Sequence, residues 1–201
     1  ENRKKLNNIT IRILTIEGNH PSPTISLPYL IYDYLKSKGK LTELFIFGKT
    51  GNEWQEICRK DNNIFNLGFL KLDDLKKEII KIDKPIYIPT DNLTMGCPNS
   101  FILAQNYSIP AVAIEKTPAS ELINLSGGGE SILIQNIRSK AYLKNESNLN
   151  LISNKIYKIL EKYKFYSKNA GNLKNYLSER NIFEKYLISI GLKKISVILD
   201  K

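Results

Sequence analysis

The chain has 201 residues, of which 42% are hydrophobic and 25% charged, and its formal net charge is +10. This apolar content predicts a packed core and excludes a disordered chain, and no apolar run reaches the length of about 18 residues that a membrane span needs. The excess of lysine indicates either a solvated basic surface or attraction to an anionic ligand, a membrane surface or nucleic acid. Because the sequence contains no ribonucleoprotein motif, zinc finger or basic helix, we expect no nucleic-acid partner.

The counts of cysteine and histidine limit the other kinds of site. Cys58 and Cys97 form neither a CxxC pair nor a disulfide framework, which is typical of a reducing, cytoplasmic compartment. His20 is the single histidine, so a multi-histidine metal site is excluded, and we expect neither a metal nor a cofactor. The polar start ENRKKLNN predicts no signal peptide, and it resembles a cut from a longer protein.

Short apolar strands alternate with amphipathic helices through the first two thirds of the chain. We predict strands over residues 9–17, 44–48, 63–67, 85–89 and 111–114, and helices over 25–37, 53–59, 72–82 and 99–107. This alternation predicts an α/β fold in which helices cover both faces of a parallel sheet, which is a Rossmann-like doubly wound domain. The turn after the first strand lacks GxGxxG, which argues against an ordinary dinucleotide dehydrogenase.

The sequence changes in character after Glu121. Residues 127–129 are all glycine and predict either a flexible surface loop or a phosphate-binding nest, and an edge strand over 131–134 and a polar loop over 135–148 follow. Three helices are predicted over 149–163, 165–177 and 179–191. We therefore divide the chain into a Rossmann-like domain, 1–148, and a C-terminal helical segment, 149–201, that packs on it.

Ligands of doubly wound sheets bind beyond the carboxyl ends of the strands. Pro98, Asn99 and Ser100 stand where a polar loop enters a helix, so they predict either a phosphate site at the free backbone amides or ordinary helix capping. Lys49 follows the second strand and is either a phosphate ligand or an exposed lysine. His20 follows the first strand and either contacts a phosphate or sugar or is a structural loop histidine.

Four segments, in order, resemble the C-terminal, nucleotide-sugar-binding domain of GT-B glycosyltransferases of the large retaining family four. They are a strand with a glycine loop, a strand followed by LG and a helix, a PNS loop leading to a helix and then IP-V-A and Glu-Leu-Ile, and a closing helix. In this sequence the segments read LFIFGKTGN at 44–52, NIFNLGFLKLDDLKKEI at 63–79, the stretch 85–123, and ERNIFEKYLISIGL at 179–192.

The resemblance implies a reaction and its partners. A sugar would be transferred from a nucleotide-diphosphate sugar, without a metal, to a glycan or lipid acceptor in surface polysaccharide biosynthesis, in the cytoplasm or at the inner face of a membrane. Leu67 and Gly68 would border the base. Glu121 would either touch the sugar or ribose or simply follow Ser120, which would cap the helix. A full enzyme of this kind has two Rossmann domains, so an N-terminal domain or a partner chain would be missing.

The sequence also departs from the family pattern, and no catalytic residue can be assigned. Met95 and Leu103 occupy the positions of two glutamates, and leucine cannot accept the hydrogen bonds of ribose hydroxyls. The turn after the first strand lacks the Arg and Lys that neutralise the diphosphate, and one such donor is worth on the order of 3 kcal/mol. The alternatives are an unusual active transferase, a catalytically inactive module that acts as a partner or regulatory subunit, and an unrelated Rossmann-like enzyme such as an epimerase.

Overall fold

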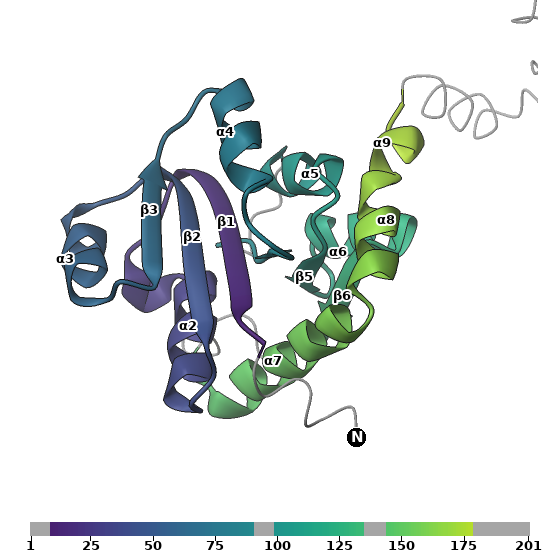
Figure 1. Ribbon diagram of the computed structural model, residues 1–201. Coiled ribbons are helices and arrows are strands. Elements are labelled where there is room, and N and C mark those ends of the chain that lie inside the picture. The colour runs from purple at the N-terminus through teal and green to yellow at the C-terminus, as the bar shows by residue number, and fades with distance from the viewer. Residues whose placement is uncertain (1–8, 91–98, 135–143, 179–201) are drawn as a thin grey trace, which may run out of the picture.

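Six parallel strands form a single sheet in the order β3-β2-β1-β4-β5-β6 (Figure 1). The computed structural model describes residues 9–90, 99–134 and 144–178. The strands are β1 (Ile11–Asn19), β2 (Thr42–Lys49), β3 (Ile64–Gly68), β4 (Ile86–Tyr87), β5 (Ala111–Ile114) and β6 (Gly129–Ile132). The strand order reverses between β1 and β4, which confirms the predicted doubly wound α/β class.

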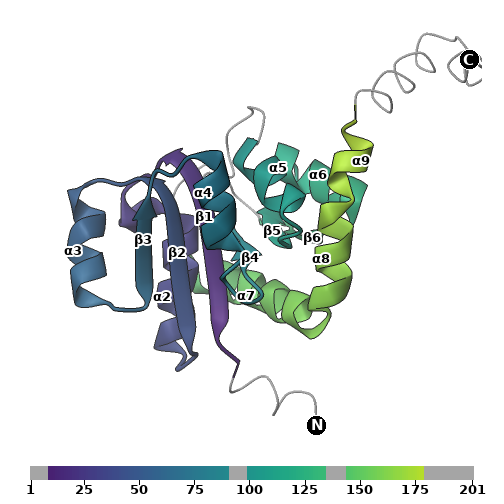
Figure 2. The ribbon, with the colours of Figure 1, turned by 45° about the horizontal axis from the view of Figure 1, so that its top comes forward.

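Helices cover both faces of this sheet (Figures 1 and 2). One hydrophobic core lies between the sheet and α2 and α7, and the other between the sheet and α4, α5, α6 and α9. The helices are η2 (Pro23–Ile25), α2 (Leu27–Ser37), α3 (Asn52–Lys60), α4 (Leu72–Ile79), α5 (Asn99–Asn106), α6 (Pro118–Ser126), α7 (Glu146–Glu161), α8 (Tyr163–Gly171) and α9 (Leu173–Tyr176). None of the described helices is long and apolar enough to cross a membrane.

Most element boundaries differ from the predictions by a few residues. The predicted strand at 111–114 is confirmed without change, whereas the first strand runs two residues further, to Asn19. The helix predicted from residue 25 begins at Leu27, because Pro23–Ile25 forms a separate 3-10 turn. Local periodicity locates an element well, but its ends depend on contacts with other segments.

The glycines at 127–129 are neither a surface loop nor a phosphate nest. Gly127 ends α6 in the left-handed conformation, and Gly129 opens β6. A Cβ at Gly128 would lie 2.4 Å from the side-chain oxygen of Gln105, and one at Gly129 would lie 2.1 Å from the Ala111 carbonyl oxygen. Both predictions for these residues were wrong, because the glycines allow β5, β6, α5 and α8 to approach closely.

The C-terminal helices pack on the sheet and on helices of both of its faces. Helix α7 contacts α2, β5 and β6, while α8 and α9 contact α5 and α6 (Figure 2). Asn145 caps α7, so this helix starts before the predicted division at residue 148, which thus falls in its first turns. The helix predicted over 165–177 is two helices, α8 and α9, and the one predicted over 179–191 lies outside the described residues.

Candidate functional site

A cavity of about 290 Å³ opens at the carboxyl edge of the sheet, between the ends of β1 and β2 and the helices α4 and α5. This position is next to the reversal of strand order, where doubly wound sheets bind their ligands. The described residues that line the cavity are Ile16, Glu17, Gly18, Phe47, Gly48, Phe69, Leu70, Leu72, Leu75, Ser100 and Leu103.

A bulge at the end of β1 shapes one wall of the cavity. Ile16 pairs with Phe47 and Asn19 pairs with Lys49, so two residues of β1 lie opposite the single residue Gly48. Gly48 has φ of 136°, and a Cβ there would lie 1.7 Å from the Glu17 carbonyl oxygen. Only glycine allows this close approach, and such bulges often redirect a side chain beside a functional site.

A buried tyrosine is bonded to Ser100, one of the residues that line the cavity. Tyr87 on β4 is only 1% exposed, and its side chain is hydrogen-bonded to that of Ser100 at the start of α5. Burial raises the pKa of Tyr87, and the negative charge of Glu17 raises it further. The phenol is therefore neutral at physiological pH, and the carboxylate of Glu17 lies within electrostatic reach of it.

The remaining wall is apolar and partly open to solvent. Phe69 is 69% exposed and Leu72 is 60% exposed, while Leu75 is buried. Leu103 follows Ser100 by three residues, so both stand on one face of α5. Exposed apolar groups beside a cavity are suited to cover a flat, apolar ligand group such as a nucleotide base.

His20 lies behind the cavity rather than on its wall. The ring is 9% exposed, its Nε2 donates to the Phe47 carbonyl at 3.0 Å, and its edge faces Trp54 at 6.2 Å between centroids. Burial lowers the pKa of His20, and the hydrogen bond to Phe47 only partly opposes this effect. The ring is therefore neutral, with Nδ1 buried and without a hydrogen-bond partner.

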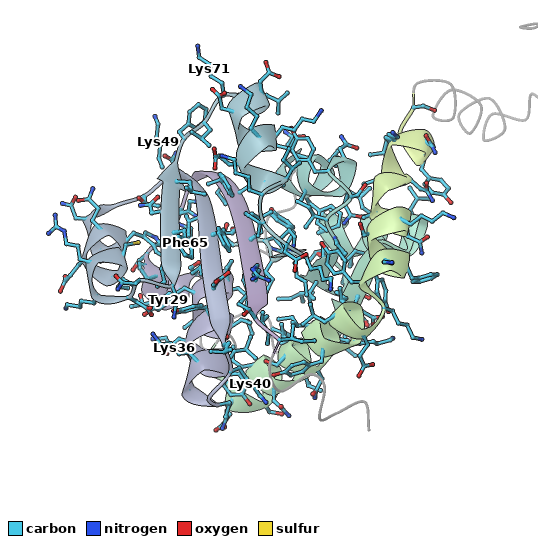
Figure 3. The ribbon with its side chains drawn as sticks, in the orientation of Figure 1. Tyr29, Lys36, Lys40, Lys49, Phe65 and Lys71 are labelled. Atoms are coloured by element: carbon cyan, nitrogen blue, oxygen red, sulfur yellow. The ribbon has the colours of Figure 1, made fainter. Side chains whose placement is uncertain are left out.

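Lys49 is exposed at the end of β2, at the same edge of the sheet as Lys71 (Figure 3). Its side chain does not line the cavity. Leu67 and Gly68 end β3 just before the cavity, where Gly68 turns the chain with φ of 68°. The residues that reach the cavity are the next two, Phe69 and Leu70.

The described residues predicted at the start of α5 lie at the cavity, whereas the residue predicted at the start of α6 does not line it. Ser100 lines the cavity and Asn99 is exposed beside it at the start of α5, whereas Pro98 and Met95 lie outside the described residues. Glu121 is exposed in the first turn of α6, whose start is closed by a capping box between Thr117 and Ser120. Glu121 is not among the lining residues.

The sequence analysis missed Glu17, Phe69 and Tyr87. Glu17 is a charged residue at the end of an apolar strand and directly before a glycine, which is a recognisable signal for the carboxyl edge of a sheet. Phe69 follows the LG pair directly. No sequence signal indicated that Tyr87 is hydrogen-bonded to Ser100, because this contact depends on the packing of β4 against α5.

The reversed strand order and the cavity beside it define the class of this fold, which is a Rossmann-like doubly wound domain with a candidate ligand site at the point of reversal. No protein-family model and no curated protein matches the sequence. Solved structures match with high probability, and among them are GT-B glycosyltransferases.

One similar structure is the pneumococcal O-GlcNAc transferase GtfA in complex with UDP and GlcNAc, with a TM-score of 0.61 and 13% identity over 92% of this chain and 35% of that chain. Anabaena HepE in complex with UDP-glucose has a TM-score of 0.57 and 14% identity over 94% and 51% of the two chains. TarM has a TM-score of 0.56 and 22% identity over 90% and 35%. The chain therefore spans about a third to a half of the length of these proteins, and it shares their fold.

Proposed function

We propose that this chain is the donor-binding half of a glycosyltransferase and that it binds a nucleotide-diphosphate sugar. The observation that carries this proposal is the cavity at the carboxyl edge of β1 and β2. Its apolar wall suits a base and its position suits a nucleotide. The similar structures of GtfA and HepE, which contain UDP or UDP-glucose, support the same ligand class.

The start of α5 supplies the second part of the site. Backbone amides at a helix N-terminus favour a phosphate, and Asn99 and Ser100 occupy this position next to the cavity. Lys49 and Lys71, exposed at the same edge, add positive charge from a greater distance (Figure 3). A diphosphate between these groups would leave its nucleoside in the cavity.

The full reaction needs parts beyond these residues. We propose a glycan or lipid acceptor, held by a second Rossmann domain or a partner chain, and transfer that needs no resident metal. The net charge of +10 would favour an anionic membrane surface on the cytoplasmic side.

A catalytically inactive partner module is the second candidate. Leu103 lines the cavity, and no lysine or arginine is among the lining residues that the structure describes. A wall without a cation gives little stabilisation to a diphosphate leaving group. This candidate predicts a stable complex with another chain and no transfer activity.

Nucleotide binding by the chain can be tested by thermal unfolding with UDP, GDP, UDP-glucose, UDP-galactose and GDP-mannose. A ligand at a hundred times its Kd stabilises the folded state by about 2.7 kcal/mol, which is roughly 5–10 °C in Tm for a chain of this size. Ser100→Ala and Lys49→Ala should reduce the shift.

Two glycine variants provide a matched comparison. Gly18 lines the cavity and Gly51 does not, and a Cβ at either position meets no atom within 4 Å. Gly18→Leu should therefore fill the cavity and abolish the shift in Tm, whereas Gly51→Leu should keep it. Flat curves with all five ligands, or equal shifts in both variants, would refute the proposed binding.

A further inference from the structure

Helices α8 and α9 form a basic outer surface at the opposite end of the sheet from α3 (Figure 1). The stretch 162–178 contains four lysines and no acidic residue. All four lysines are exposed, and no ion pair joins any of them to another residue that the structure describes. They are Lys162, Lys164, Lys168 and Lys174.

The basic residues elsewhere in the chain are arranged differently. Residues 9–90 contain twelve basic and ten acidic residues, whereas residues 144–178 contain seven basic and two acidic ones. On α3 Lys60 pairs with Glu56, and on α4 Lys77 pairs with Asp74. Pairs at these spacings are typical of a solvated helix surface. The surface of α8 and α9 lacks such acidic neighbours, which indicates an anionic partner.

Hydrogen bonds on the inner side of α8 determine which of its side chains point outward. The side chains of Tyr163 and Ser167 donate to backbone carbonyls of the segments beneath the helix, at 2.9 and 2.7 Å. Lys164, Phe165 and Lys168 are three or four residues apart at the nearest spacings, so they share the opposite side of the helix. The helix therefore holds two ammonium groups and one aromatic ring on the same outward face.

The exposed ring selects among anionic partners. Phe165 is 60% exposed although it is a large apolar side chain, and Tyr176 on α9 is 40% exposed. At a bilayer surface a ring enters the boundary of the acyl chains, while lysine stems extend and place their charges at the anionic headgroups. A nucleic-acid duplex or an acidic polypeptide would neutralise the lysines but leave the ring in water. The combination therefore favours a membrane.

We propose that the outer surface of α8 and α9 docks on an anionic membrane, with Phe165 at the acyl boundary and Lys164 and Lys168 at the headgroups. This inference rests on the membrane contact within the proposed function and adds the surface that makes it, but it does not depend on nucleotide binding. Helices α8 and α9 pack against α5, and Ser100 of α5 lines the candidate cavity. A single helix therefore connects the docking surface with the proposed donor site.

Sedimentation of the chain with lipid vesicles tests the role of the lysines. The wild type should bind vesicles of phosphatidylglycerol and phosphatidylcholine in equal parts, and it should not bind phosphatidylcholine alone. Each lysine near such a surface is worth about fivefold in binding, so Lys164→Gln/Lys168→Gln should lower the partition coefficient about 25-fold. The matched control is Lys60→Gln/Lys77→Gln, which removes the same charge from paired lysines and should change it only about twofold.

Tryptophan fluorescence tests whether the ring itself enters the lipid. Trp54 is the single tryptophan and is 1% exposed, so its emission should not respond to vesicles. The emission of Phe165→Trp should shift to shorter wavelength when the mixed vesicles are added. The control is Ile80→Trp, at a residue 72% exposed at the end of α4, which should show no shift. Phe165→Ser should lower the partition coefficient about 5- to 10-fold.

Three results would overturn the inference. They are a wild type that does not sediment with the mixed vesicles, an equal loss in both double lysine variants, and no fluorescence shift for Phe165→Trp. Binding to single-stranded RNA or to polyglutamate without binding to vesicles would assign a different partner and overturn it too. UDP titration of Lys164→Gln/Lys168→Gln should match the wild type. A chain that binds the vesicles but no nucleotide would refute the nucleotide site and leave the docking surface intact.

Discussion

Gly48→Ala is expected to destabilise the fold and to disturb the cavity in the same step. The residue has φ of 136°, where side chains other than hydrogen are strained, and its new Cβ would lie 1.7 Å from the Glu17 carbonyl oxygen. The strained backbone costs about 1–3 kcal/mol. Overpacking against a rigid backbone atom costs a further 1–3 kcal/mol or so.

The total is about 2–6 kcal/mol, which is a large part of the 5–15 kcal/mol that stabilises an ordinary domain. Two other glycines separate the components of this cost. Gly39 has φ of 72° but open space around its Cβ, and Gly18 has open space without a positive φ. Gly39→Ala should therefore show only the backbone cost, and Gly18→Ala a change within about 0.5 kcal/mol.

Equilibrium unfolding in urea measures all three variants, with the free energy of unfolding extrapolated to water. The expected order of destabilisation is Gly48→Ala first, then Gly39→Ala, then Gly18→Ala. A Gly48→Ala protein as stable as Gly39→Ala would contradict the close approach of β1 and β2 at the bulge. Weaker UDP binding by Gly48→Ala at a temperature where the protein is folded would show that the bulge also positions the site.

Three further predictions concern buried polar side chains. Gln105 is 0% exposed and its amide nitrogen donates to two backbone carbonyls, so Gln105→Leu should cost about 2–4 kcal/mol in urea unfolding, and no loss would contradict those bonds. Burial lowers the pKa of His20 below 6.5, so wild-type stability should fall as the pH drops from 7.5 to 5.5, and His20→Gln should flatten this dependence; an equal slope in the variant would refute the assignment. Burial raises the pKa of Glu130, but hydrogen bonds from two lysines and Tyr166 outweigh it and hold the pKa below 4.5. The stability that Glu130 contributes is therefore present above pH 4.5 and lost below it, so the stability difference between the wild type and Glu130→Gln should shrink between pH 6 and pH 3, and a constant difference would argue against the ionised carboxylate.

The sequence by itself determined the class of the fold and the edge of the sheet where the candidate site lies. Apolar runs such as 111–114, separated by amphipathic helices, are local patterns. They can be recognised in the sequence without knowing which segments pack beside them. Ser100 could also be predicted as a site residue, because a helix start after a strand at that edge is a local feature of the sequence. The positions of Lys49, Glu121 and the pair at 67–68 near this edge follow from the same local order, and their roles remain predictions.

Only the tertiary structure decided which side chains meet. The bulge at Glu17 and Gly18 depends on the register between two strands about 30 residues apart, and from the sequence alone Gly48 is indistinguishable from an ordinary loop glycine. The glycines at 127–129 pack against α5 and β5 for a similar reason, and the buried ring of His20 lies beside Trp54 on α3. Such contacts join segments that are distant in the chain, so they cannot be predicted from the periodicity of the sequence.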